Sequence, residues 1–161
     1  MGQCGGALIA PDTVLTAAHC REAGDYTNRQ IIVSNYKKGE VNDPDDMVQS
    51  KVRFCDRWIL HPQFDTLDFK YADIALCKLN EPVLDVDPIA LNEDSSVATT
   101  SDEPLVAIGM GLAGVFSRLP LLLRKVNVTS VSKEVCQPVW DEFGGEYVIG
   151  DNKVCAGNKN L

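Results

Sequence analysis

The opening stretch of the chain, up to residue 20, restricts the fold more than any other feature of the sequence. An apolar run over residues 7–10 and a second one over residues 14–18 are separated by a turn signal that begins at Pro11. Two short strands joined by a tight turn lie antiparallel, so their outer ends come together. We therefore expect a β-hairpin whose ends bring Cys4 and Cys20 close enough to form a disulfide.

His19 directly precedes the second of these cysteines, and its meaning depends on the rest of the chain. A disulfide at the neighbouring position would hold the backbone beside the imidazole in place, which suits a histidine that must keep one position. The alternative is a stapled hairpin with an incidental histidine. The hairpin alone does not decide between these interpretations.

The remaining sequence has the pattern of an all-β protein. Short apolar or alternating runs are separated by Gly, Pro, Asn and Asp, and few windows show a helical period. Residues 132–140 are the exception, with Ser132 as a cap and Val135 and Val139 as an apolar stripe. Residues 80–103 are rich in Pro, Asp, Ser and Thr and predict a connector between two halves. Strands are expected at residues 31–33, 51–60, 73–79, 105–108, 121–128, 147–149 and 153–157.

Composition excludes several classes of partner. The 161 residues carry a net charge of −8, with 45% hydrophobic and 24% charged residues, as in soluble globular proteins. No basic cluster offsets the acidic excess, so we expect neither nucleic acid nor an anionic membrane as a partner. The apolar run at residues 119–123 is too short to span a bilayer and contains a proline.

The cysteines indicate an oxidising compartment. There are six, widely spaced, none in a C-x-x-C pair, and only two histidines accompany them, so disulfides are expected and a zinc site is not. Asn127 begins an N-glycosylation sequon, which also suits a secreted protein. Met1 is not followed by a signal peptide, so we expect that the N-terminal part of a secreted parent protein is missing.

Five motifs in register resemble the trypsin/chymotrypsin-type family of serine endopeptidases. The stretch Thr-Ala-Ala-His-Cys at residues 16–20 is similar to the family's catalytic-histidine signature, and Asp-Ile-Ala-Leu at 73–76 is similar to its catalytic-aspartate strand. His-Pro-Gln-Phe at 61–64 resembles the segment before that strand. Gly-Met-Gly at 109–111 stands where the family has Gly-Trp-Gly, and Val-Cys-Ala-Gly at 154–157 resembles the approach to the specificity pocket.

The resemblance implies an all-β, trypsin-like fold of two six-stranded antiparallel β-barrels with the active site between them. Residues 1–92 would form a nearly complete N-terminal barrel that contains His19 and Asp73. Residues 93–161 would form the connector and a partial, truncated C-terminal barrel.

The resemblance also implies Cys4–Cys20 and Cys136–Cys155 disulfides. Cys55 and Cys77 are then left over on neighbouring antiparallel strands. Either a disulfide between them or two separate buried thiols fits this position.

By the same resemblance, His19 is the general base and Asp73 the carboxylate that orients it. The nucleophilic serine has no counterpart, because none of the serines stands in a Gly-x-Ser-Gly setting. The family's serine, oxyanion hole and pocket floor lie downstream of the match to residues 154–157. The expectation is a fragment truncated at both ends and inactive alone.

Further departures from the family pattern leave proton transfer untouched. Met110 replaces the usual Trp, and Ala72 precedes the aspartate where Asn is frequent. His19 and Asp73 are further apart than is typical, which indicates an insertion around residues 66–71. His61 is interpreted as a surface turn residue.

The acidic segment at residues 39–46 coincides with a loop that binds Ca²⁺ in some family members. It offers hard oxygen ligands, although a solvated acidic loop is the ordinary interpretation; the weak candidates are Glu40, Asn42 and Asp45, with Asp43 and Asp46 beside them. No other cofactor is expected.

Three functions compete. The first is a secreted serine endopeptidase, acting on protein or peptide substrates and recognised by protease inhibitors. The second is a non-catalytic binding module that keeps the protease scaffold. The third is a disulfide-stapled β domain unrelated to proteases, which fails if the His19 imidazole lies within hydrogen-bond distance of the Asp73 carboxylate.

Overall fold

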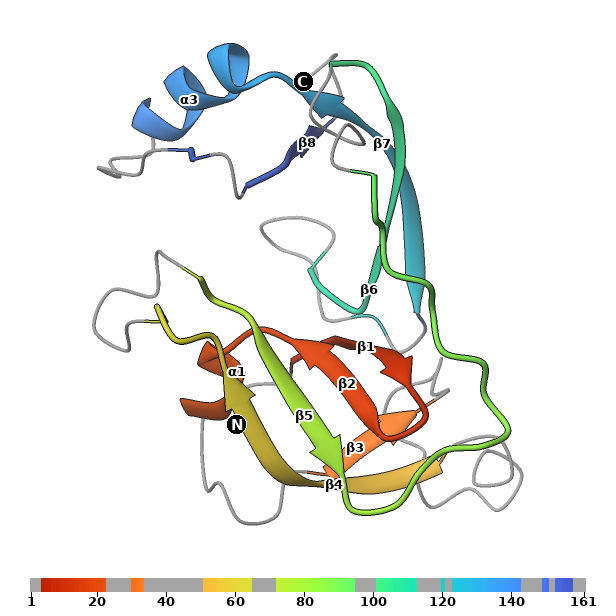
Figure 1. The fold of residues 1–161 in the computed structure, drawn as a ribbon. Coiled ribbons are helices and arrows are strands. Elements are labelled where there is room, and N and C mark those ends of the chain that lie inside the picture. The colour runs from red at the N-terminus through yellow and green to blue at the C-terminus, as the bar shows by residue number, and fades with distance from the viewer. Residues whose placement is uncertain are drawn as a thin grey trace. The chain divides into compact units, whose positions relative to one another are not determined.

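A computed structural model describes residues 4–22, 30–33, 51–64, 72–94, 101–112, 120, 123–142, 149–150 and 153–157. The chain divides into two compact units, Met1–Leu91 and Asn92–Leu161. Most of the regular structure is β-strand (Figure 1). The elements are β1 (Gly6–Ala10), β2 (Thr13–Thr16), α1 (His19–Glu22), β3 (Gln30–Val33), β4 (Lys51–Leu60), β5 (Ala75–Leu79), β6 (Pro104–Gly109), β7 (Arg124–Val131), α3 (Lys133–Glu142) and β8 (Cys155–Gly157).

The first unit is an antiparallel sheet in the order β1-β2-β5-β4-β3. The ten-residue strand β4 joins its two sides, because residues 51–54 pair with β3 and residues 55–60 pair with β5. An irregularity between Cys55 and Arg57 lies at the start of the pairing with β5. Such a bulge bends and twists a strand, which lets β4 turn the sheet around its own core.

The core of this unit lies inside the curled sheet. Alternation along β5 buries every second residue, so that Ala75, Cys77 and Leu79 face inward. Cys77 is directly opposite Val14 in the ladder between β2 and β5. The buried cluster comprises Val14, Val33, Cys55, Cys77, Leu79 and Val83, and Leu8, Ile31, Trp58 and Val86 pack against it.

Polar contacts fasten the turn between β1 and β2 to β5. The Lys78 ammonium lies 2.7 Å from the Asp12 carboxylate and donates to the Thr13 hydroxyl at 2.8 Å. The hydrogen bond from Lys78, followed by that from Thr13, holds the pKa of Asp12 below its ordinary value. These contacts favour the register in which Thr13 pairs with Lys78 and Thr16 with Ala75.

The second unit contains a three-stranded antiparallel sheet in the order β6-β7-β8. Along the chain, α3 lies between β7 and β8. Ser130 on β7 is fully buried, and its hydroxyl accepts from the backbone of Glu103 at 2.9 Å. The Ser132 carbonyl accepts from Cys136 at 3.0 Å, so the helix starts directly after Ser132. A Cys136–Cys155 disulfide ties the helix to β8.

The expected all-β, trypsin-like fold is confirmed, and within the described residues its two sheets have five and three strands. Several expectations about the elements were wrong in detail. β7 covers residues 124–131 and not 121–128, because its pairing with β6 and β8 extends to Thr129 and Val131. The apolar stripe expected on the helix is exposed, since none of its residues is buried. Of the strand expected at 147–149, only Ile149 is described, and it is buried outside any strand.

Neither helix in the described part of the chain is long and apolar enough to cross a membrane.

Candidate functional site

His19 is brought to its position by β2 and the short helix that follows. The run at residues 14–18 was expected to be one strand, but β2 ends at Thr16, where the ladder to β5 ends. The chain then turns, with Cys20 donating to the Ala17 carbonyl at 3.2 Å, and His19 is the first residue of α1. Ala18 is fully buried, whereas the His19 side chain is 49% exposed. The imidazole therefore projects outward from a firmly packed segment.

Asp73 lies at the same end of this ladder, ahead of β5. The expected strand at 73–79 begins at Ala75, so Asp73 belongs to the turn that leads into it. Ile74 donates to the Ala72 carbonyl at 2.7 Å, which makes Asp73 the central residue of a three-residue turn. Ala72 has a φ of 51°, in the left-handed region that residues other than Gly and Asn rarely adopt.

The register between β2 and β5 brings these two residues together. Thr16 and Ala75 are paired at the end of the antiparallel ladder. The residues that follow β2 and those that precede β5 must therefore lie at the same edge of the sheet. His19 comes three residues after Thr16, and Asp73 comes two residues before Ala75. A pair 54 residues apart in the sequence is thus placed in contact by a four-residue ladder.

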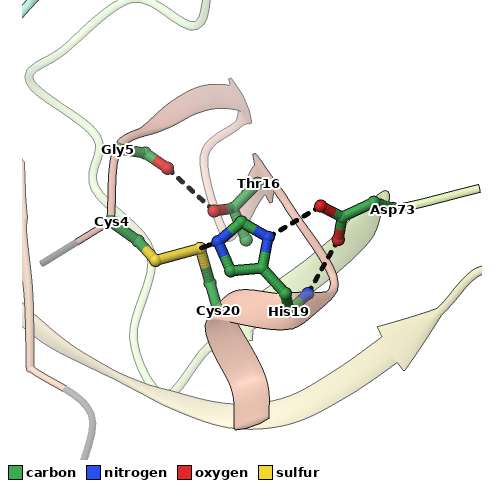
Figure 2. The surroundings of a disulfide bond; sticks show 6 residues. All are labelled: Cys4, Gly5, Thr16, His19, Cys20 and Asp73. Atoms are coloured by element: carbon green, nitrogen blue, oxygen red, sulfur yellow. Dashed lines mark hydrogen bonds and ion pairs between the residues drawn. A yellow bond between two sulfur atoms is a disulfide. The ribbon is translucent and has the colours of Figure 1, made fainter. Parts of the chain in front are cut away.

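Both oxygens of the Asp73 carboxylate bind His19 (Figure 2). Oδ2 lies 2.7 Å from the ring nitrogen Nδ1, and Oδ1 accepts from the backbone N–H at 2.8 Å. An ionised carboxylate only accepts, so the proton between them belongs to Nδ1. In the neutral ring this tautomer leaves the lone pair on Nε2.

The electrostatics of Asp73 favour its ionised form. Partial burial, with 27% of the side chain exposed, raises its pKa. Hydrogen bonds from the ring and backbone of His19 and from the backbone of Ala18 outweigh burial, and the net effect holds the pKa of Asp73 below its ordinary value. The carboxylate therefore stays charged at neutral pH and stabilises a proton on Nδ1.

A disulfide adjoins the other side of the imidazole. Cys4 and Cys20 are bonded to one another, and the Cys20 sulfur lies 3.7 Å from Nε2 of His19 (Figure 2). Cys20 is buried, and the Thr16 hydroxyl donates to the Gly5 carbonyl at 2.8 Å, which secures the chain next to Cys4. Bonds on both sides thus limit the movement of the histidine.

The other residues singled out from the sequence have separate locations. Cys55–Cys77 and Cys136–Cys155 are disulfides, so all three pairs named from the sequence are bonded. In this structure Cys55 and Cys77 are bonded to each other and are not separate thiols. Asn127 lies on β7 and is exposed. Glu40, Asn42, Asp43, Asp45 and Asp46 lie outside the described residues.

His61 has the local structure of a turn residue. It is exposed, and its Nδ1 accepts from the backbone of Gln63 at 3.2 Å. Its backbone N–H donates to the Ile74 carbonyl at 3.0 Å, which fixes the segment next to Asp73. Met110 is partly buried after β6.

Two contributors to the site were not recognised from the sequence. Ala72 sets the direction of the Asp73 turn, and the absence of the frequent Asn at this position was the only available signal. Thr16 binds the backbone beside the disulfide, but its place in a motif gave no indication of that role.

No serine occurs among the described residues of the first unit. The described serines are Ser101, Ser130 and Ser132, all of the second unit, and Ser130 is buried within its own sheet.

The chain is similar to known proteins along nearly its whole length. The family model named Trypsin matches residues 1–160. Serine proteinase stubble of Drosophila melanogaster is 30% identical over 158 residues, covering 96% of this chain and 19% of that protein. Hypodermin-B of Hypoderma lineatum is 29% identical over 154 residues, covering 95% of this chain and 56% of that protein.

The fold has a counterpart among solved structures. The structure of neuropsin, described as a serine protease expressed in the limbic system of mouse brain, superimposes with a TM-score of 0.76 at 21% identity. The match covers 98% of this chain and 65% of that structure. This chain thus spans 19% of the length of stubble, 56% of the length of hypodermin-B and 65% of the neuropsin structure.

Proposed function

The chain belongs to the trypsin family, and on that premise we propose that it forms part of a serine endopeptidase in which His19 is the general base and Asp73 orients it. The observation that carries this proposal is the pair of hydrogen bonds that one carboxylate accepts from the ring and the backbone of the histidine. Membership of the trypsin family excludes an unrelated β domain, and the same contact supports the proposed role of His19 over that of an incidental residue.

The chemistry follows from the tautomer. Nε2 takes the proton of a serine hydroxyl as that oxygen attacks the peptide carbonyl, and later gives the proton to the leaving amine. Asp73 holds the ring in place and stabilises the imidazolium formed in between. Every participating group is a protein group, so the reaction as proposed uses no cofactor.

The 161 residues alone are proposed to be inactive towards peptide bonds. The sequence contains eight serines, and none is followed by glycine as in Gly-x-Ser-Gly. Without a serine in that setting, His19 has no nucleophile to activate, so the covalent route to hydrolysis is not available. We propose proteins or peptides as substrates of the parent protein, protease inhibitors as its binders, and the extracellular space as its location. Three disulfides are consistent with that location.

The domains that we propose correspond closely to the two units of the chain. We assign residues 1–92 to the N-terminal barrel, which holds both His19 and Asp73, and residues 93–161 to the connector and part of the C-terminal barrel.

The test begins with the transcript downstream of the codon for Leu161. We expect an in-frame Gly-Asp-Ser-Gly-Gly, and the encoded protein is expected to cleave a peptide ester. His19→Ala in that protein should reduce kcat by at least about 10³-fold, whereas His61→Ala, the matched histidine in a turn, should leave it within about twofold. Equal activity of the two variants would overturn the role of His19. Cleavage by the 161-residue chain itself, lost in His19→Ala, would overturn its proposed inactivity.

A non-catalytic binding module is the second candidate, and one observation favours it. Apolar side chains on β6 and β7 are exposed, among them Val106, Ile108 and Val126. Such surface suits an interaction partner. A monodisperse 161-residue monomer that melts cooperatively would favour this module, whereas aggregation through the exposed strands would oppose it.

A further inference from the structure

We propose that reduction of the Cys4–Cys20 disulfide converts Cys4, Cys20 and His19 into a binding site for Zn²⁺. The sulfur atoms of both cysteines and a ring nitrogen of His19 all lie within 4.8 Å of one another. Two thiolates and an imidazole are ligands that zinc prefers in proteins. The sequence spacing argued against a resident zinc site, and the proposed site exists only in the reduced protein.

The distances suit tetrahedral coordination. Zn–S and Zn–N bonds of about 2.3 and 2.05 Å at the tetrahedral angle place the two ligand atoms about 3.6 Å apart. The Cys20 sulfur and Nε2 of His19 are separated by 3.7 Å. One edge of the tetrahedron is therefore already formed, and only the Cys4 side must open.

The structure keeps the two cysteines adjacent after the covalent link is broken. Gly6 is paired with Thr16 in the ladder between β1 and β2, and the Thr16 hydroxyl donates to the Gly5 carbonyl. Cys20 is buried at the start of α1. These contacts hold both ends of the hairpin without the disulfide, so the thiols remain near His19.

Asp73 supplies the partner that metal-binding histidines generally have. Such a histidine donates its other ring N–H to a carboxylate, which fixes the tautomer and makes the metal-binding nitrogen more basic. Here Nδ1 is bound to the Asp73 carboxylate at 2.7 Å, so Nε2 is the nitrogen that faces the sulfur atoms.

The conversion requires a dithiol reductant. Cys4 is exposed, so a thiolate of the reductant attacks its sulfur and releases the Cys20 thiolate; the second thiol of the reductant then closes its own disulfide and releases Cys4. Two electrons pass to the protein disulfide, and the dithiol is oxidised. Zn²⁺ then binds both thiolates, which have lost their protons, together with Nε2, and a water completes the four ligands.

A consequence rests on the proposed function. Zinc would occupy the same lone pair of Nε2 that is proposed to accept the serine proton. Reduction in the presence of zinc would therefore switch the base off, and removal of zinc followed by oxidation would restore it. The zinc site itself does not depend on peptidase activity.

The test is a zinc titration of the 161-residue chain after reduction with a dithiol and removal of the reductant. Zn²⁺ competes with a chromophoric chelator, and Co²⁺ serves as a spectroscopic probe through its thiolate-to-metal absorption. We expect a site in the reduced protein that is absent from the oxidised protein. Its affinity should fall at least about 100-fold in His19→Ala and about 10–100-fold in Asp73→Asn, and stay unchanged in His61→Ala.

The pattern of variants separates this site from other thiols. Reduction also opens the disulfides of Cys55–Cys77 and Cys136–Cys155, and zinc bound there does not depend on His19. Equal affinity in His19→Ala and His61→Ala would overturn the proposal. An unfolded reduced chain would bind zinc without regard to Asp73, so an unaltered affinity in Asp73→Asn would overturn it as well.

Discussion

Asp73→Ala is expected to destabilise the first unit even though no substrate is present. The carboxylate makes two hydrogen bonds to His19, one to the ring and one to the backbone, at 2.7 and 2.8 Å. Hydrogen bonds to charged groups contribute about 1.5–3 kcal/mol each. The His19 side chain is 49% and that of Asp73 27% exposed, so water can partly replace the carboxylate. We therefore expect a loss of about 2–3 kcal/mol in the free energy of unfolding, less than the sum of about 3–6 kcal/mol for two such hydrogen bonds shielded from water.

The measurement is thermal unfolding followed by tryptophan fluorescence. The chain has two tryptophans, and Trp58 packs against the core of the first unit while Trp140 lies on α3. A Trp140→Phe background therefore reports the first unit alone. In a chain of this size the loss corresponds to a fall in Tm of about 4–12 °C. Asp87→Ala, an exposed aspartate of the same unit, is the control and should change stability by less than about 0.5 kcal/mol.

A double-mutant cycle with His19→Ala isolates the contact between the two side chains. The backbone hydrogen bond of residue 19 survives in His19→Ala, so the coupling energy reports the ring alone and should be about 1–2 kcal/mol. If Asp73→Ala melts within error of the Asp87→Ala control, or the cycle yields no coupling, the reasoning that the carboxylate anchors His19 is refuted.

Four further results are expected. Because the pKa of Asp73 is lowered in the folded state, its stabilisation is complete above the ordinary value of 3.8 and is lost as the pH falls through the lowered value; the Asp73→Ala deficit should shrink in acid melts. Ala72→Gly should raise the free energy of unfolding by up to about 1 kcal/mol, measured in urea, since φ is 51°, and a decrease would contradict left-handed strain. Val83 is 1% exposed and its neighbour Leu84 is 83% exposed. In the same assay Val83→Ala should lower the free energy of unfolding by about 2 kcal/mol, and Leu84→Ala by less than about 0.5 kcal/mol. Gly6→Ala should lower the free energy of unfolding by about 1–3 kcal/mol, because a Cβ there would lie 2.7 Å from a side chain of β2. An unchanged urea midpoint would refute that close packing.

The sequence by itself determined the class of fold and named the residues of the candidate site. Period-two alternation and turn residues are local signals, so the strands at residues 51–60 and within 73–79 could be predicted from their own residues. The hairpin that ends at His19 was equally local. The pairing of its cysteines and the choice of Asp73 came from the resemblance of short motifs to a known family.

Only the tertiary structure decided how Asp73 reaches His19. The contact depends on the register of β2 against β5, and a shift of one residue would move the two side chains apart. It also depends on a turn in which Ala72 adopts a backbone conformation that its residue type disfavours. Register and backbone strain are set by packing between distant segments. The sequence pattern of either strand alone therefore does not contain the distance of 2.7 Å that makes the pair a candidate site.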